Sequence, residues 1–137
     1  MPIIPDKGEK MTLALILISL FWPVNTPADS WECSNNIEIT CGAEGCVAAD
    51  PGAFTPMRVS FDSLGGMRVC AYSGCWEGAG KIFENADFLV LTGSRLNFSA
   101  KEPASSNQDV MIALDKKDNV AMLKAGGFSH PIVCKRN

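Results

Sequence analysis

Six cysteines hold most of the reactive chemistry of this sequence, and four of them lie in two closely spaced pairs. Cys41 and Cys46 bound the segment CGAEGC, and Cys70 and Cys75 bound the segment CAYSGC. Thiols at this spacing can form disulfides, bind zinc or act as a redox pair. Paired ligands of structural zinc sites are about two to four residues apart, and redox pairs usually read Cys-x-x-Cys. The even cysteine count and the pattern Cys-x-x-x-Gly-Cys favour disulfides, with zinc binding and redox chemistry as the alternatives.

A hairpin would account for both closely spaced pairs. Directly opposed residues on two antiparallel strands have Cβ atoms close enough for a disulfide. Gly45 and Gly74 precede the second cysteine of each pair and can adopt the backbone angles that a tight turn requires. The other two cysteines lie far apart in the chain, and a bond between them would join the first strand to the last. The expected disulfides are Cys33–Cys134, Cys41–Cys46 and Cys70–Cys75.

The single histidine, His130, is the main candidate for catalysis. Ser129 precedes it directly, but neighbours in a strand point to opposite faces, so the two do not form a nucleophile and its base. The segment GFSHP also lacks the second glycine of a nucleophile elbow. We interpret His130 as a surface or strand-end residue. A small periplasmic hydrolase that uses His130 and a carboxylate is the catalytic alternative.

The segment closed by Cys70 and Cys75 is the best candidate for binding. It contains Tyr72, the only tyrosine, together with Ser73, and Trp76 follows it directly. Rigid aromatic side chains on a loop that is ordered beforehand lose little entropy when they dock. The alternative is a plain hairpin in which Tyr72 packs on the domain. We expect Tyr72, Ser73 and Trp76 to bind a partner, and we expect no catalytic residues, metal site or cofactor.

Short segments that alternate apolar and polar residues predict the elements that position these groups. The clearest alternating segments are 37–41, 57–61, 67–71, 96–100 and 110–114. The apolar segment FLVLT at 88–92 predicts a strand buried on both faces, ended by a turn at Gly93-Ser94. The glycines of WEGAGK predict a bent strand or a bulge. Strands at roughly ten-residue spacing predict an all-β fold, a small antiparallel up-and-down barrel or sandwich of about eight strands stapled by disulfides.

The first 30 residues have the order of a secretory signal peptide. Two lysines precede the apolar run 11–24, which contains Pro23 near its end, and Pro27 and small residues follow it. The run is shorter than the roughly 20 residues needed to span a bilayer, which argues against the alternative of a membrane anchor. We therefore expect cleavage after Ser30, or alternatively after Ala28. The predicted product is one domain, 31–137, with no membrane span and a periplasmic or secreted location.

The charge of the chain excludes some classes of partner. The formal net charge is −3, and the longest basic runs are Lys116-Lys117 and Lys135-Arg136. Nucleic-acid binding needs a concentrated cationic surface, which these pairs do not supply. The expected partner is a protein or glycan in the cell envelope or outside the cell, and not a nucleic acid.

The apolar leader, the two Cys-x-x-x-Gly-Cys segments and the terminal Cys134 carry a resemblance. In this layout the sequence resembles small uncharacterised cysteine-rich exported proteins of Gram-negative bacteria, a resemblance that implies export but no activity. Its architecture is also similar to that of periplasmic lysozyme inhibitors, which are small β-barrels with disulfides, although none of their inhibitory residues can be matched here. We therefore expect an exported, non-enzymatic binding module, such as an inhibitor of an envelope or host protein. A structural component of the cell envelope is a further alternative.

Overall fold

The computed structural model describes residue 2, residues 25–99 and residues 107–137. The apolar run 11–24 and most of the predicted signal peptide, 1–30, therefore lie outside the described residues. Within the described ranges, every regular element is a β-strand. No helix in these ranges is long and apolar enough to cross a bilayer.

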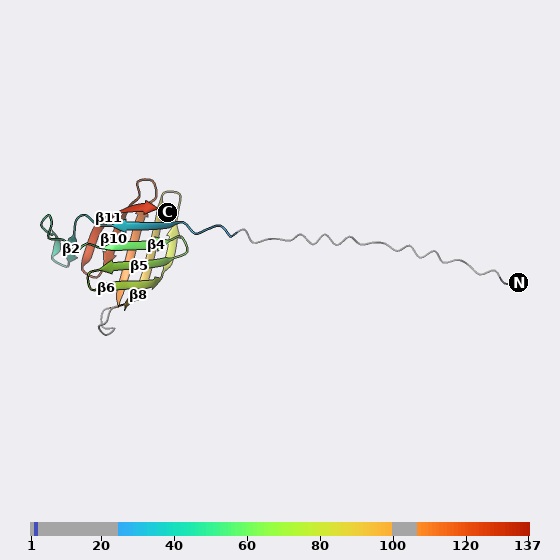
Figure 1. Cartoon of the computed structure of the whole chain (residues 1–137), viewed down its shortest axis with the longest axis horizontal. Helices are drawn as coiled ribbons and strands as arrows, with labels where there is room; N and C mark the ends of the chain where they lie inside the picture. Colours follow the sequence, from blue (N-terminus) through green and yellow to red (C-terminus); the bar gives the residue numbers. More distant parts are fainter. Residues whose placement is uncertain (1, 3–24, 100–106) are drawn as a thin grey trace.

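The strands form one antiparallel sheet that closes on itself as a barrel (Figure 1). Eight of them follow the order β1-β4-β5-β6-β8-β9-β10-β11, and β1 pairs with β11 to close the circle. The predicted all-β barrel is thus confirmed. The strand bounds are β1 Ser30–Ser34, β2 Ile39–Gly42, β3 Gly45–Ala48, β4 Arg58–Asp62, β5 Gly66–Ala71, β6 Gly74–Ala79, β7 Lys81–Glu84, β8 Phe88–Ser99, β9 Gln108–Asp115, β10 Val120–Ala125 and β11 Phe128–Arg136.

Two elements add to this barrel. The β2–β3 hairpin stands outside it and is attached to β11 through the pair Phe128↔Thr40 (Figure 1). Strand β7 pairs with the first half of β8, whereas β6 pairs with its second half. The break between β6 and β7 falls at Gly80, where a Cβ atom would collide with the Thr92 carbonyl oxygen. The glycine therefore allows the close approach of two strands, as expected for a bent strand.

Alternation along the barrel strands places one face of each strand in the core. In β10, Ala121, Leu123 and Ala125 are buried, whereas Val120 and Met122 are exposed. Burying one large apolar side chain contributes about 1.5–3 kcal/mol relative to leaving it exposed. The buried apolar core comprises Trp31, Cys33, Met57, Val59, Phe61, Met67, Val69, Leu89, Leu91, Leu96, Val110, Ile112, Leu114, Ala121, Leu123, Ala125, Ile132 and Cys134.

Strand β8 differs from the sequence prediction in two ways. It is one strand of 12 residues rather than two strands separated by a turn, and its pairing with β9 shifts between Gly93 and Leu96. This bulge takes up the residues of the predicted turn, with Arg95 at a φ of 51°. The first half is also not buried on both faces, because Leu89 and Leu91 point inward while Phe88 is 48% exposed.

Three disulfides link the chain, and they are the pairs that the spacing favours: Cys33–Cys134, Cys41–Cys46 and Cys70–Cys75. Cys33 and Cys134 are directly opposed on β1 and β11, and both are buried. Their bond therefore crosses the seam at which the barrel closes. Since disulfides persist in oxidising surroundings, the three bonds are consistent with a location outside the reducing cytosol.

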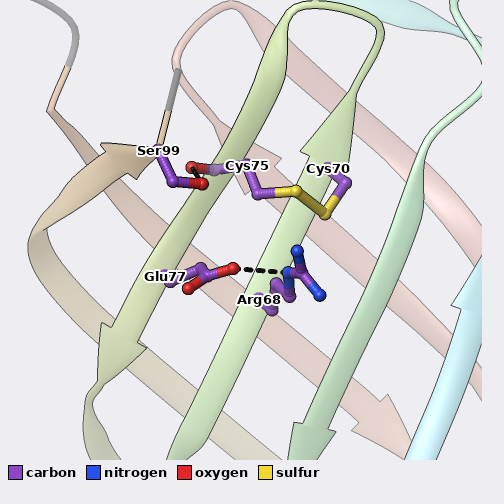
Figure 2. The surroundings of a disulfide bond; sticks show 5 residues. All are labelled: Arg68, Cys70, Cys75, Glu77 and Ser99. Atoms are coloured by element: carbon purple, nitrogen blue, oxygen red, sulfur yellow. Dashed lines mark hydrogen bonds and ion pairs between the residues drawn. A yellow bond between two sulfur atoms is a disulfide. The ribbon is translucent and has the colours of Figure 1, made fainter. Parts of the chain in front are cut away.

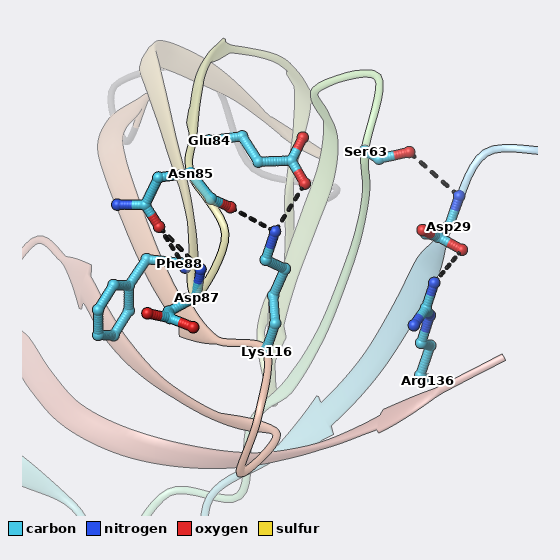
Figure 3. Close-up of polar contacts among 8 residues, drawn as sticks. All are labelled: Asp29, Ser63, Glu84, Asn85, Asp87, Phe88, Lys116 and Arg136. Carbon is cyan, nitrogen blue, oxygen red and sulfur yellow. Dashed lines mark hydrogen bonds and ion pairs between the residues drawn. The ribbon is translucent and has the colours of Figure 1, made fainter.

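The two ends of the barrel carry different segments. One end, here called the terminal end, holds residues 25–29, the C-terminus and the β4–β5, β7–β8 and β9–β10 turns (Figure 1). There the carboxylate of Asp29 lies 2.7 Å from the Arg136 guanidinium, and the Asp29 N–H donates to Ser63 Oγ (Figure 3). Lys116 Nζ also lies 3.0 Å from Glu84 Oε1. These contacts tie neighbouring turns together at the terminal end.

Candidate functional site

The hairpin of β5 and β6 carries the predicted binding residues. Cys70 and Cys75 are opposed in its last pairs, and their disulfide closes the turn that contains Tyr72 and Ser73 (Figure 2). Tyr72 is 80% exposed, and Ser73 is exposed beside it. The hairpin is also held from the side, since the hydroxyl of Ser99 donates to the Cys75 carbonyl oxygen at 3.1 Å (Figure 2). The structure thus presents Tyr72 and Ser73 on a turn that is fixed at its base.

Trp76 has a different position from Tyr72. It pairs with the inward residue Val69, packs against the core and is only partly exposed. Its ring lies 5.2 Å from that of Phe98 on β8, centroid to centroid. The structure therefore does not bring Trp76 to the exposed turn. Instead, Trp76 packs at the base of the hairpin that carries Tyr72.

The second short disulfide closes the β2–β3 hairpin. Cys41 and Cys46 are opposed, and the turn between the strands is exposed. All four residues of β3 are exposed, with Val47 at 73%. The hairpin therefore contributes little to the core. Its disulfide fixes the shape of an element that projects from the barrel.

Both closed hairpins lie at the end of the barrel opposite the termini, here called the hairpin end. The last residue of β8, Ser99, pairs with Cys75, so β8 ends beside the closed turn. The β10–β11 turn is at the same end and contains Gly127, whose carbonyl oxygen accepts the Cys41 N–H at 3.0 Å. Two separate disulfide-closed turns, far apart in the sequence, thus project from one end of the molecule.

A polar groove on the outer face of β1, β4, β5 and β6 was not predicted from the sequence. It consists of two neighbouring depressions of about 530 and 400 Å³ that share Glu32, Ser60 and Arg68. The Arg68–Glu77 ion pair, at 2.5 Å, lines it beside the Cys70–Cys75 disulfide (Figure 2). Its residues come from separate strands and meet only through the register of the sheet, so no local sequence pattern reveals them.

An apolar area covers the outer surface of β7 to β11. Six large apolar side chains there are between 39% and 61% exposed: Phe83, Phe88, Met111, Val120, Met122 and Val133. The strand register places Met122 between Ala113 and Pro131, so apolar residues continue across three strands. This apolar face borders the polar groove at β11, where Val133 pairs with the groove residue Ser34.

His130 is in the core, and the prediction of a surface or strand-end position is wrong. His130 has 0% exposure, and in the strand register it is opposite the inward residue Leu123. Neither ring nitrogen has a hydrogen-bond partner among the described residues, and the ring meets Phe128 edge-on at 5.9 Å. Burial lowers the pKa of His130, although the nearby Glu38 carboxylate raises it. Since His130 lines neither depression, the imidazole is not accessible to a substrate from the groove.

Within the described ranges, no group of three or more His, Cys, Asp or Glu side chains is placed to hold a metal ion. Every cysteine is in a disulfide. The candidate functional surface is the hairpin end together with the adjoining polar groove, because two disulfide-closed turns are exposed at that end. Comparisons of the chain with family models, with curated proteins and with solved structures find no match.

Proposed function

We propose that this chain is an exported, non-enzymatic binding module that contacts a protein or glycan partner through its hairpin end. One observation carries the proposal: two separate disulfides close exposed turns at the same end of the barrel. The predicted signal peptide, 1–30, and a periplasmic or secreted location are part of the proposal. Disulfides persist in those compartments, which supports this part.

The energetics of the three disulfides support a role in recognition. In the chain-entropy relation, the Cys33–Cys134 bond, with a separation of 101 residues, contributes about 4–5 kcal/mol to folding. Each short bond, with a separation of 5 residues, contributes about 2 kcal/mol. The two short bonds therefore add less to global stability, and their main effect is to fix the shape of exposed turns.

A fixed turn suits the inhibitor that we expect. Docking a side chain that is already ordered costs less entropy than docking one on a mobile loop. Tyr72 combines a large apolar ring with a hydroxyl group, a combination that is enriched at the centres of protein interfaces. An inhibitor of an envelope or host protein would use such a side chain as its anchor.

A capture experiment with matched variants tests the proposal. The natively exported protein, immobilised with its disulfides intact, is incubated with envelope and host extracts as wild type, as Tyr72→Ala and as Leu64→Ala. Leu64 is the matched control, because it is 78% exposed and lies in the β4–β5 turn at the terminal end. We expect one partner to be retained by wild type and by Leu64→Ala, and to be lost or at least about tenfold weaker with Tyr72→Ala. Equal retention by all three proteins, or no retained partner, would overturn the proposal.

The apolar face favours a second candidate, a structural component of the cell envelope. Large exposed apolar areas often mark surfaces that are covered by another molecule. The same experiment separates the two candidates. Recovery with the peptidoglycan or outer-membrane fraction, unaffected by Tyr72→Ala, would favour the structural component.

A further inference from the structure

We infer that the free edge of β3 takes up an extended, basic peptide segment of the partner as an additional strand. The inference rests on the proposed binding function and names the chemistry of the partner. It concerns the arm, defined as residues 35–57, which leaves the barrel after β1, forms the β2–β3 hairpin and returns at β4.

The backbone of β3 is oriented for strand addition. On the other strand of the hairpin, the Cys41 N–H donates to Gly127 and therefore points away from β3. Cys46 is directly opposite Cys41, and in such an antiparallel pair both residues direct their N–H and C=O groups outward. Cys46 and, two residues further on, Ala48 thus direct these groups to the free side. Within the described residues, β3 pairs only with β2.

Apart from its length of four residues, the edge of β3 lacks the usual protection. Natural edge strands are shielded from pairing by being very short, or by lysines, prolines, bulges or a covering segment. The sequence of β3 is GCVA, which contains neither a charge nor a proline, and all four residues are exposed. The Cys41–Cys46 disulfide keeps this short hairpin closed although little of it packs on the core. An extended segment could therefore form hydrogen bonds with β3 without any rearrangement of the barrel.

The charge of the arm determines which segment fits. Residues 35–57 contain Glu38, Glu44 and Asp50, and no lysine or arginine. Glu44 and Asp50 are exposed, whereas Glu38 accepts the Thr55 N–H at 2.6 Å. The uncompensated negative charge attracts a basic segment and increases its association rate. A second copy of this chain is the poorer occupant, because pairing two β3 edges would bring like charges together.

The recognition can be measured with synthetic peptides. The probe is a fluorescent heptapeptide of alternating lysine and valine, and its control has glutamate in place of lysine. Fluorescence anisotropy with the oxidised full chain should show saturable binding of the basic peptide and none of the acidic one. Affinity should fall as salt is added, because the attraction is electrostatic. Replacing both exposed carboxylates, with Glu44→Gln and Asp50→Asn, should weaken binding several-fold and reduce the salt dependence.

A pair of variants at one position separates strand addition from general charge attraction. Ala48→Pro removes an N–H on the free side, and prolines are tolerated on edge strands. Ala48→Val is the matched control, because valine is similar in size to proline but keeps the backbone N–H. We expect Ala48→Pro to lower the affinity about tenfold and Ala48→Val to change it less than about twofold. In the wild-type protein, hydrogen exchange at the Cys46 and Ala48 amides should slow when the basic peptide is added.

The outcomes separate this inference from the proposed function. Equal binding by Ala48→Pro and Ala48→Val, or unchanged hydrogen exchange at both amides, would overturn strand addition and leave the Tyr72 result untouched. A wild-type dimer that Ala48→Pro converts to a monomer would also overturn it, because a second copy would then occupy the edge. Peptide binding that depends on the Ala48 N–H would support the inference even if the Tyr72→Ala capture experiment failed.

Discussion

His130 illustrates how one position can be misjudged when residue type is given more weight than register. In β11, the residues Phe128, His130, Ile132 and Cys134 alternate with outward ones, and the other three are partly or fully buried. That alternation was present in the sequence and would have placed the imidazole inside. The single histidine was instead interpreted from its polar character. The position of Tyr72 on an exposed turn was predicted correctly, because a turn between two paired cysteines leaves its central side chains exposed.

The buried imidazole should make the protein sensitive to acid. Burial holds the pKa of His130 below its ordinary value of 6.5, so the unfolded chain binds more protons than the folded one as the pH falls through this range. The free energy of unfolding should therefore decrease below about pH 6.5 and level off once the pH passes the folded pKa. The measurement is urea unfolding between about pH 7.5 and 5.5, above the range in which ordinary carboxylates titrate.

The control for this measurement is His130→Phe, which keeps a flat ring and removes the titrating group. Its free energy of unfolding should be nearly independent of pH over the same range, whatever its absolute stability. Parallel pH dependences in wild type and variant would show that another group is responsible.

At the scale of the element, β8 shows what a local pattern can and cannot predict. The segment FLVLT was correctly predicted to be a strand from its continuous apolar residues. Its burial was misjudged because the exposed Phe88 belongs to the apolar face, which only the assembled sheet creates. The bulge at Gly93-Ser94-Arg95 resembles a turn in the sequence, since both need unusual backbone angles. Its real support, a hydrogen bond of 2.7 Å from the Arg95 N–H to Asp109, comes from the next strand.

The bulge gives a prediction about packing. A Cβ atom at Gly93 would lie 2.8 Å from Leu96 Cδ2 and 2.9 Å from Met67 Sδ, so Gly93→Ala must displace two core side chains. We expect this variant to lose about 1–3 kcal/mol of unfolding free energy in chemical denaturation. The matched control is Gly42→Ala in β2, where nothing lies within 4 Å of the added atom. Equal stabilities of the two variants would mean that the core beside the bulge is not tightly packed.

For the whole molecule, the barrel could be predicted but the functional surfaces could not. Regular strand spacing, turn residues and paired cysteines were sufficient for an all-β, disulfide-stapled domain. The arm, the polar groove and the apolar face each combine residues whose proximity depends on strand order. Strand order is set by the packing of the closed sheet, and a single sequence does not record it. Of the candidate site, the closed turn with Tyr72 was therefore predictable, whereas the common end shared by both hairpins was not.

The unequal sizes of the disulfide loops predict unequal effects on stability. The double variant Cys33→Ala/Cys134→Ala should lose about 4–5 kcal/mol of unfolding free energy, and somewhat more because both side chains are buried. Cys41→Ala/Cys46→Ala should lose about 2 kcal/mol or less, since its loop is short and exposed. Denaturant titration of both variants under identical conditions provides the comparison. A larger loss for the exposed pair would contradict the assignment of the arm as an element outside the core.

The seam bond between β1 and β11 also has a mechanical consequence. Because Cys33 is in the first strand of the barrel and Cys134 is in the last, a force applied between the two termini would pass through their sulfur atoms and bypass the strands between them. Stretching the oxidised protein would not extend the chain between the two bonded cysteines. Reduction would release the 101-residue separation, adding a contour length of about 340 Å. The closed barrel is thus shielded from tension in the compartment where its cysteines stay oxidised.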